Sequence, residues 1–494
     1  MNHPNPPAKT PDQIWEGDLF GRRGDAELLI DYIESVGSRP SLREDCRGYT
    51  ISVDADYGIG KSYFLRRLAE HLELTHPVAF VDAWSDDLAN EPLTAITATL
   101  KKAIAPLVRK EPKLEQQWKA VASKTGEVAK IVAKGLLKKG LGLVITSAAV
   151  DLADAALGDL PEAKDAALDD ALKDAGKGAA DDAVDAVSKR KAGELMAERI
   201  ATFEAGQLAI TELKKSLSDL VEALPVGDIA TPVVVIIDEL DRCRPTYAIK
   251  LLEETKHLFD VTGIVFVLGM HSEQLSRSVS GAYGPDFDGQ GYLRRFVNRQ
   301  YSLRFPDLEP LVRHLLNQHA ISESRLIFPA VAKTDRTLEI LPASEMIARY
   351  MRAYGMTARD AFSIMDIIQT CVAVTKDSEL LMPYLLPMII RKVKGMKFGQ
   401  TPKIETAPSW NYAFEDWNNQ TLSTVSMESA FLDLSGKVGL SQRDLVNSAN
   451  ANDKISLVLL KIQQNIDINS NALALPRNYE DLLQRVARFS NGSE

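Results

Sequence analysis

The sequence predicts an α/β fold, an open parallel sheet that is interrupted by a helical insertion and followed by helical regions. Short apolar runs typical of buried strands alternate with amphipathic helical segments on both sides of residues 108–230. The insertion itself is rich in Ala, Lys and Asp and lacks strand signals. From about residue 310 onward the apolar residues recur at helical spacing.

Before the insertion, strands and helices follow one another in a regular order. Residues 25–36 have the apolar spacing of a helix, 48–55 read as a strand that leads into a loop, and 62–74 read as an amphipathic helix. A second strand is expected at 77–84 and a second helix at 91–107. This alternation is typical of strands that pair in parallel.

After the insertion the same alternation resumes. Residues 233–237, VVVII, form a short apolar run typical of a buried parallel strand, and two acids follow it directly. A helix at 247–259 and a second buried strand at 263–272 continue the pattern. Helical spacing then dominates, as in 308–320 and 359–374.

These patterns divide the chain into expected segments. They are a flexible tail (1–17), a first core part (18–107), a helical insertion (108–230), a second core part (231–307), a helical lid (308–400) and a mostly helical C-terminal region (401–494). Residues 101–140 carry a net charge of +8 and residues 151–186 one of −8. These two arms either fold back as an antiparallel helical hairpin or expose their charges as solvated helix faces.

The composition of this 494-residue chain is typical of a reducing compartment, and a cytoplasmic location is expected. Cys46, Cys243 and Cys371 lie far apart, which excludes a disulfide framework and a zinc site built on paired cysteines. The polar N-terminus shows no apolar signal region. The apolar run 140–150 has 11 residues and is too short to span a bilayer. The net charge of −10 is unevenly spread and indicates no particular partner.

Residues 54–64, DADYGIGKSYF, contain a G-x-G-K-S loop between a predicted strand and a predicted helix. In such loops the backbone N–H groups hold phosphates, the lysine binds the β- and γ-phosphates, and the serine hydroxyl binds Mg²⁺. The candidates for nucleotide contact are Gly58, Ile59, Gly60, Lys61, Ser62 and Tyr63. Ala55 stands where the full Walker A pattern has glycine, and Asp56 adds a carboxylate. The alternative is a glycine-rich strand–helix turn with a surface lysine.

Asp238 and Glu239 directly follow the apolar run 233–237. An aspartate at the end of a buried strand can hold Mg²⁺, and a neighbouring glutamate can activate water as a general base. The alternative is an acidic helix cap. Together with the loop around Lys61, the two acids indicate phosphoryl transfer with ATP and Mg²⁺ as cofactors.

With both motifs in place, the chain resembles the KAP family of P-loop NTPases, over roughly residues 18–105 and 230–375. The matching segments are DLFGRRGDAELLIDYI (18–33), DADYGIGKSYFLRRL (54–68), FVDAW (80–84), VVVIIDELDRCRPTYAIKLLE (233–253), IVFVLGMHSEQL (264–275) and GYLRRFVNRQYSLRFP (291–306). Tyr57 stands where the family usually has Trp, and Glu239 where it often has a second Asp. The long spacer between the two motifs is also family-like, although in many members it carries transmembrane helices.

The resemblance implies an ATPase domain with a helical lid that works as a switch in assemblies, in bacteria sometimes in phage defence. It places Lys61 and Ser62 on phosphate and Mg²⁺, and makes Asp238 and Glu239 the Walker B pair. Asp241 and Arg242 are expected to orient the Walker B loop rather than to perform chemistry. Trp84 is expected to pack beside the phosphate loop, and the adenine pocket is expected to include Phe20 and Arg22.

Other positions of the resemblance are candidates that each have a plain alternative. His271 stands where related proteins place a polar sensor at a strand end, although the family usually has Asp; a surface histidine is the alternative. The candidates for an arginine finger or a partner contact are Arg294, Arg295 and Arg299. Arg359 resembles a lid sensor arginine. Simple surface charge is the alternative for all four.

Three functions are compatible with the sequence. The first is an ATP-hydrolysing switch or motor subunit that works with protein partners, among them an effector subunit, with an oligomer as a further option. The second is a nucleotide-binding scaffold without turnover of its own. The third is a membrane-surface adaptor that uses residues 119–150. Nucleic-acid binding has only the short basic stretch 391–403 in its favour.

Overall fold

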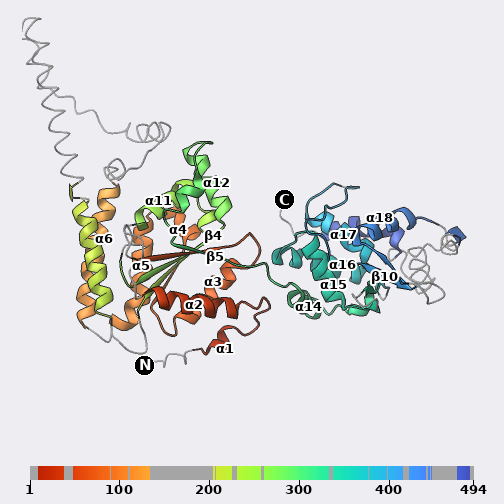
Figure 1. The fold of residues 1–494 in the computed structure, drawn as a ribbon, viewed down its shortest axis with the longest axis horizontal. Helices are drawn as coiled ribbons and strands as arrows, with labels where there is room; N and C mark the ends of the chain where they lie inside the picture. The colour runs from red at the N-terminus through yellow and green to blue at the C-terminus, as the bar shows by residue number, and fades with distance from the viewer. Residues whose placement is uncertain are drawn as a thin grey trace, which may run out of the picture. The chain divides into compact units, whose positions relative to one another are not determined.

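The computed structural model of the chain describes residues 9–37, 48–89, 91–108, 112–133, 204–205, 207–224, 231–256, 261–332, 338–376, 378–397, 399–415, 422–440, 443–444, 447 and 475–489. Its contacts divide the chain into two compact units (Figure 1). The first unit comprises Met1–Glu16, Arg23–Ala55 and Lys61–Leu303. The second unit comprises Gly17–Arg22, Asp56–Gly60 and Arg304–Glu494.

A five-stranded parallel sheet forms the centre of the first unit, in the order β2-β3-β4-β1-β5. The strands are β1 (Tyr49–Asp54), β2 (Val78–Asp82), β3 (Val233–Asp238), β4 (Ile264–Met270) and β5 (Arg299–Ser302). All residues of β3 and β4 are buried, as expected for central strands covered on both faces. The α/β fold predicted from the alternating pattern is therefore confirmed.

Helices cover both faces of this sheet. The longer ones are α2 (Arg23–Gly37), α3 (Lys61–Leu72), α5 (Pro92–Val108), α11 (Pro245–Lys256) and α12 (Ser272–Tyr283). The shorter ones are α1 (Pro11–Ile14), α4 (Ala83–Asp86) and α13 (Gly289–Leu293). Alternate β3 residues, Val233, Val235 and Ile237, share a buried cluster with α5, α11 and α12. The helices α2 and α3 lie on the opposite face (Figure 1).

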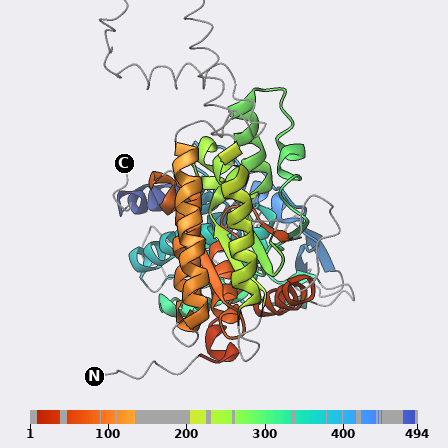
Figure 2. The ribbon, with the colours of Figure 1, turned by 90° about the vertical axis from the view of Figure 1, so that its left-hand side faces the viewer.

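Between β2 and β3, the described part of the insertion is helical. Helix α6 (Pro112–Ala133) and residues 207–222 lie side by side (Figure 2), and both contribute to the same buried cluster as α5. Lys124 of α6 pairs with Glu212 at 2.6 Å. Most of the two oppositely charged arms falls within residues 134–203, which lie outside the described residues.

The second unit is mainly helical. Its helices are α14 (Glu309–Gln318), α15 (Ala343–Ala353), α16 (Ala358–Thr375), α17 (Met382–Val393), α18 (Met427–Lys437) and α21 (Tyr479–Val486). They enclose one buried apolar cluster, in which the Tyr350 and Tyr412 hydroxyls lie 2.7 Å apart. Cys371 is buried and free here, as Cys243 is in the first unit, whereas Cys46 lies outside the described residues.

Short strands in the second unit were not anticipated from the sequence. They are β6 (Leu326–Ile327), β7 (Val331–Ala332), β8 (Leu338–Glu339), β9 (Leu380–Leu381), β10 (Tyr412–Glu415) and β11 (Leu422–Val425). They form a four-stranded sheet, β11-β10-β7-β8, and a pair, β6-β9. The sequence predicts a mostly helical region after residue 310, and these short strands are an addition to it. Strands of two to four residues are too short to show an alternating apolar pattern.

Across the described ranges, none of the helices is both long enough and apolar enough to cross a bilayer. The apolar run 140–150 lies outside these ranges.

Candidate functional site

The loop after β1 contains two backbone conformations that favour glycine. Gly58 has a φ of +80° and Gly60 a φ of +92°, in the region where a Cβ is disfavoured. Ala55 instead continues the strand, because its backbone N–H donates to the Met270 carbonyl at 3.2 Å. An alanine is therefore accommodated where the full motif has glycine. The Asp56 side chain is exposed, so its charge is not buried beside the loop.

Within the second unit, residues 17–22 support this loop. Arg22 is only 2% exposed, and its Nη2 donates to the carbonyls of Ile59 at 3.3 Å and Arg304 at 2.8 Å. A Cβ on Gly60 would lie 3.5 Å from the Phe20 ring. These contacts make Arg22 a brace of the loop backbone. The adenine contacts of Phe20 and Arg22 stay predictions.

Gly58 also has a steric reason to be glycine. A Cβ on Gly58 would lie 2.5 Å from Thr357 Oγ1, within the second unit. Thr357 precedes α16, where its N–H and hydroxyl both donate to Asp360, at 2.7 and 2.8 Å. Arg359, the candidate lid sensor, is exposed in the first turn of α16. Its sensor role stays a prediction.

The chemistry-bearing residues of the two motifs meet in the first unit. Lys61 and Ser62 are the first residues of α3, and the Lys61 ammonium lies 3.0 Å from Asp241 Oδ1. The Ser62 hydroxyl donates to Glu239 Oε1 at 3.3 Å, and its proximity to the Asp238 carboxyl acts to lower the pKa of that carboxyl. The structure therefore brings Lys61, Ser62, Asp238 and Glu239 together, although the two motifs are far apart in the sequence.

Asp238 and Glu239 differ in their surroundings. Asp238 is 2% exposed, and burial raises the pKa of its carboxyl, although the Ser62 hydroxyl, the Glu239 N–H and the Lys61 charge act in the opposite direction. Glu239 has a left-handed backbone, with φ 59° and ψ 28°, which is uncommon for a residue with a side chain. Its carboxylate pairs with Arg242 at 3.0 Å. Such backbone strain clusters at functional sites.

Two other acids at strand ends make structural hydrogen bonds instead. Asp54 accepts from the Ser272 N–H and from the Gln300 amide, both at 2.7 Å, so it joins β1 to α12 and β5. Asp82 caps α4 by accepting the Ser85 N–H at 3.0 Å. Of these strand-end acids, Asp238 at the end of β3 and Glu239 directly after it are the ones that lie against the first turn of α3.

The remaining sequence candidates of the first unit make local contacts. His271 directly follows β4 and caps α12 by accepting the N–H of the third helical residue at 3.5 Å. Arg295 lies over the ring of Tyr292, 5.9 Å from its centroid. A hydrogen bond with Tyr32 raises the pKa of Arg299. Their roles as sensor or arginine finger stay predictions.

Two aromatic rings near the motifs lie against guanidinium groups. Arg67 lies over Tyr63 at 4.6 Å, and Arg242 lies over Trp84 at 5.8 Å. Trp84 is 55% exposed, and the expectation that it packs beside the phosphate loop stays a prediction. The exposed ring lies against the Arg242 guanidinium, and that guanidinium pairs with the Glu239 carboxylate.

Sequence reasoning missed Gly269 in β4. A Cβ there would lie 2.4 Å from Leu65 Cδ1 and 2.8 Å from Asp238 Oδ1. The glycine therefore provides the space in which Asp238 and α3 approach each other. Sequence reasoning also missed the pairing of Asp241 with Lys61. For Gly269, the only local signal was a glycine near the end of the predicted apolar strand. For the pairing of Asp241 with Lys61, there was no signal in the local sequence.

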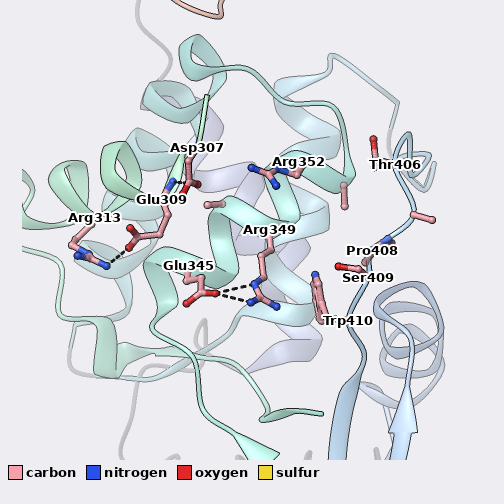
Figure 3. A pocket seen from close by; sticks show the side chains of 13 residues that line it. Asp307, Glu309, Arg313, Glu345, Arg349, Arg352, Thr406, Pro408, Ser409 and Trp410 are labelled. Atoms are coloured by element: carbon pink, nitrogen blue, oxygen red, sulfur yellow. Dashed lines mark hydrogen bonds and ion pairs between the residues drawn. The ribbon is translucent and has the colours of Figure 1, made fainter. Parts of the chain in front are cut away.

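A cavity of about 720 Å³ lies in the second unit and is lined by α14, α15 and residues 406–410 (Figure 3). Its charged lining residues are Arg313, Arg349, Arg352, Asp307, Glu309 and Glu345. Arg313 pairs with Glu309, and Arg349 with Glu345, each at 2.6 Å. The lining thus carries three arginines and three carboxylates, whose formal charges sum to zero.

The donor set around Ser62 suits Mg²⁺ better than a metal held by protein alone. No group of three or more His, Cys, Asp or Glu side chains with metal-ligand geometry occurs in the described part of the chain. Mg²⁺ commonly takes one or two carboxylates and completes its shell with phosphate oxygens and water. A buried carboxylate beside a hydroxyl, Asp238 and Ser62, fits that requirement.

Comparison with known proteins agrees with this geometry. The family model described as the KAP family P-loop domain matches residues 23–335, which is more than half of the chain. The matched range includes both the G-x-G-K-S loop and the acids Asp238 and Glu239. No curated protein matches the chain.

Proposed function

The chain belongs to the KAP family of P-loop NTPases, and from this membership and the site geometry we propose that it binds ATP with Mg²⁺ and hydrolyses it. In the proposal, the protein is a switch or motor subunit of a larger assembly, with a protein partner that acts as effector, in the cytoplasm. A role in bacterial defence against phage is part of the proposal and rests on the family resemblance.

The observation that supports hydrolysis best is that Lys61 and Ser62 lie close to Asp238, the last residue of β3, and to Glu239, which follows it. Lys61 would bind the β- and γ-phosphates. Ser62 and Asp238 would hold Mg²⁺, which neutralises charge on the phosphate oxygens when it is bound. Glu239 would orient the attacking water and accept its proton.

Two substitutions test phosphate binding and water activation separately. Lys61→Ala should weaken ATP binding, measured by calorimetry, because it removes the cation that faces the phosphates. Glu239→Gln should keep binding but lower phosphate release by about 10²–10⁴-fold, the usual contribution of a general base. Lys101→Ala, which changes an exposed lysine of α5, is the matched control. Phosphate release that is the same in the wild type and both site variants would refute the mechanism.

A scaffold that binds nucleotide without turnover is the second candidate. It is favoured by the pairing of Lys61 with Asp241 and of Glu239 with Arg242, because both groups are occupied by protein partners. Purified protein that binds ATP but releases no phosphate, alone or with co-purified partners, would favour the scaffold. The adaptor hypothesis has less support, because Val121 and Val128 on α6 are buried inside the first unit. Residues 134–150 of the proposed membrane segment lie outside the described residues.

A further inference from the structure

Asp241 has no step in the proposed chemistry, yet it holds the lysine on which that chemistry depends. Lys61 Nζ lies 3.0 Å from Asp241 Oδ1, and the two side chains are only 10% and 1% exposed. The second carboxylate oxygen of Asp241 is buried and has no hydrogen-bond partner among the described residues. Among the described residues, Lys61 is therefore the cation that pairs with the buried Asp241 carboxylate.

The turn after β3 explains how Asp241 reaches Lys61. Glu239 is in the left-handed conformation, and residues Leu240–Arg242 form a single 3-10 turn. Leu240 is fully buried and anchors the turn in the core. The acids on either side of Leu240 both contact the start of α3, Glu239 at Ser62 and Asp241 at Lys61.

We propose that Asp241 is a positioning residue that competes with nucleotide phosphates for the Lys61 ammonium and thereby weakens nucleotide binding. This inference rests on the proposed function, because it needs a nucleotide whose phosphates Lys61 binds. In the nucleotide-free protein, Asp241 keeps the buried ammonium paired. When Lys61 turns to the phosphates, Asp241 is left buried with its charge unpaired. The free energy that this costs makes the net binding free energy of the nucleotide less favourable.

The same pair stabilises the nucleotide-free fold. Removing one partner of a buried ion pair leaves the other charge uncompensated, which destabilises the protein. Asp241→Asn should therefore have two effects of opposite sign. The variant should unfold more easily than the wild type without nucleotide, and it should bind ATP and ADP more tightly. A residue that only maintains the fold of the site would instead lose both stability and affinity when it is changed.

The experiment is a double-substitution cycle on the full chain. Nucleotide affinity is measured by titration of a fluorescent ATP analogue, and the unfolding midpoint in urea is measured without nucleotide. Asp241→Asn should tighten binding by roughly tenfold, the order expected for coupling of this kind. In a Lys61→Met background the same change should leave the affinity unaltered. It should raise the unfolding midpoint there, because it neutralises the buried charge that Lys61→Met leaves unpaired. Asp241→Glu, which keeps the charge, should bind within about twofold of the wild type.

A control variant removes a negative charge elsewhere. Asp286→Asn changes an exposed carboxylate in the first unit and should leave both measurements at their wild-type values. Weaker or unchanged binding in Asp241→Asn would overturn the inference, as would a gain that persists in the Lys61→Met background. If Asp241→Asn does not fold while Asp241→Asn with Lys61→Met does, the buried pairing is supported. Competition is then tested with Asp241→Ser, which should bind ATP more tightly than Asp241→Glu, and equal affinities would overturn it. A wild-type chain that binds no nucleotide would instead refute the proposed function.

Discussion

Replacing Gly269 by alanine tests whether the close approach of β4, α3 and Asp238, the last residue of β3, is required. The new Cβ would lie 2.4 Å from Leu65 Cδ1 and 2.8 Å from Asp238 Oδ1. Carbon atoms in contact are normally about 3.5–4.0 Å apart, so at least one neighbour has to move by about 1 Å. Leu65 is fully buried and Asp238 is 2% exposed, so neither can move into solvent.

Extra volume in a packed core typically lowers stability by about 1–3 kcal/mol. We expect a loss of this size for Gly269→Ala, measured as the free energy of unfolding in urea by circular dichroism. Displacement of Asp238 should also reduce the benefit that Mg²⁺ gives to ATP binding, measured by calorimetry with and without Mg²⁺. A variant with wild-type stability and wild-type Mg²⁺ dependence would refute this steric reasoning.

Two companion variants separate the causes. Leu65→Val removes the atom nearest to the new Cβ, so the double variant should regain part of the stability lost in Gly269→Ala. The Mg²⁺ effect should persist in the double variant, because the contact with Asp238 remains. Gly281→Ala is the matched control: Gly281 lies in α12, and a Cβ there would meet nothing within 4 Å. Alanine in a helix should raise stability by up to about 1 kcal/mol.

Two further predictions concern other parts of the chain. Arg22→Ala removes charged hydrogen bonds to two carbonyls and should lower the free energy of unfolding by about 2–4 kcal/mol. Arg22→Lys should restore little of this stability, because a lysine lacks the guanidinium fork. An Arg22→Ala variant as stable as the wild type would contradict the bracing role. Burial lowers the pKa of His71 from 6.5, and its Nδ1 accepts from Trp15 Nε1 at 3.2 Å. The unfolded chain therefore takes up this proton more readily, so stability should fall as the pH drops below 6.5, as measured by urea unfolding. His71→Gln should lose less stability over that range, and an equal loss would contradict the assignment.

Much of the fold was predictable because its signals are local. Apolar runs such as 233–237 and the helical spacing in 62–74 correspond to β3 and α3 with boundaries shifted by one or two residues. The short strands of the second unit were not predictable, since two residues carry no periodic pattern. Their pairing depends on partners far away in the chain, as when β7 pairs with β10.

The sequence by itself determined the α/β class, the G-x-G-K-S loop and the acids Asp238 and Glu239. Each of these depends on residue types at short spacing, where backbone preference and side-chain chemistry act locally. Ala55 was ambiguous in the sequence, and the structure shows it continuing β1 with a backbone hydrogen bond.

Only the tertiary structure decided which groups share the site. Lys61 meets Asp241 across 180 positions of the chain, and Arg22 reaches the Arg304 carbonyl across 282. Gly269 has its role only because β4 lies beside β3 and under α3. Such contacts depend on how buried elements pack, and no short stretch of sequence contains both partners.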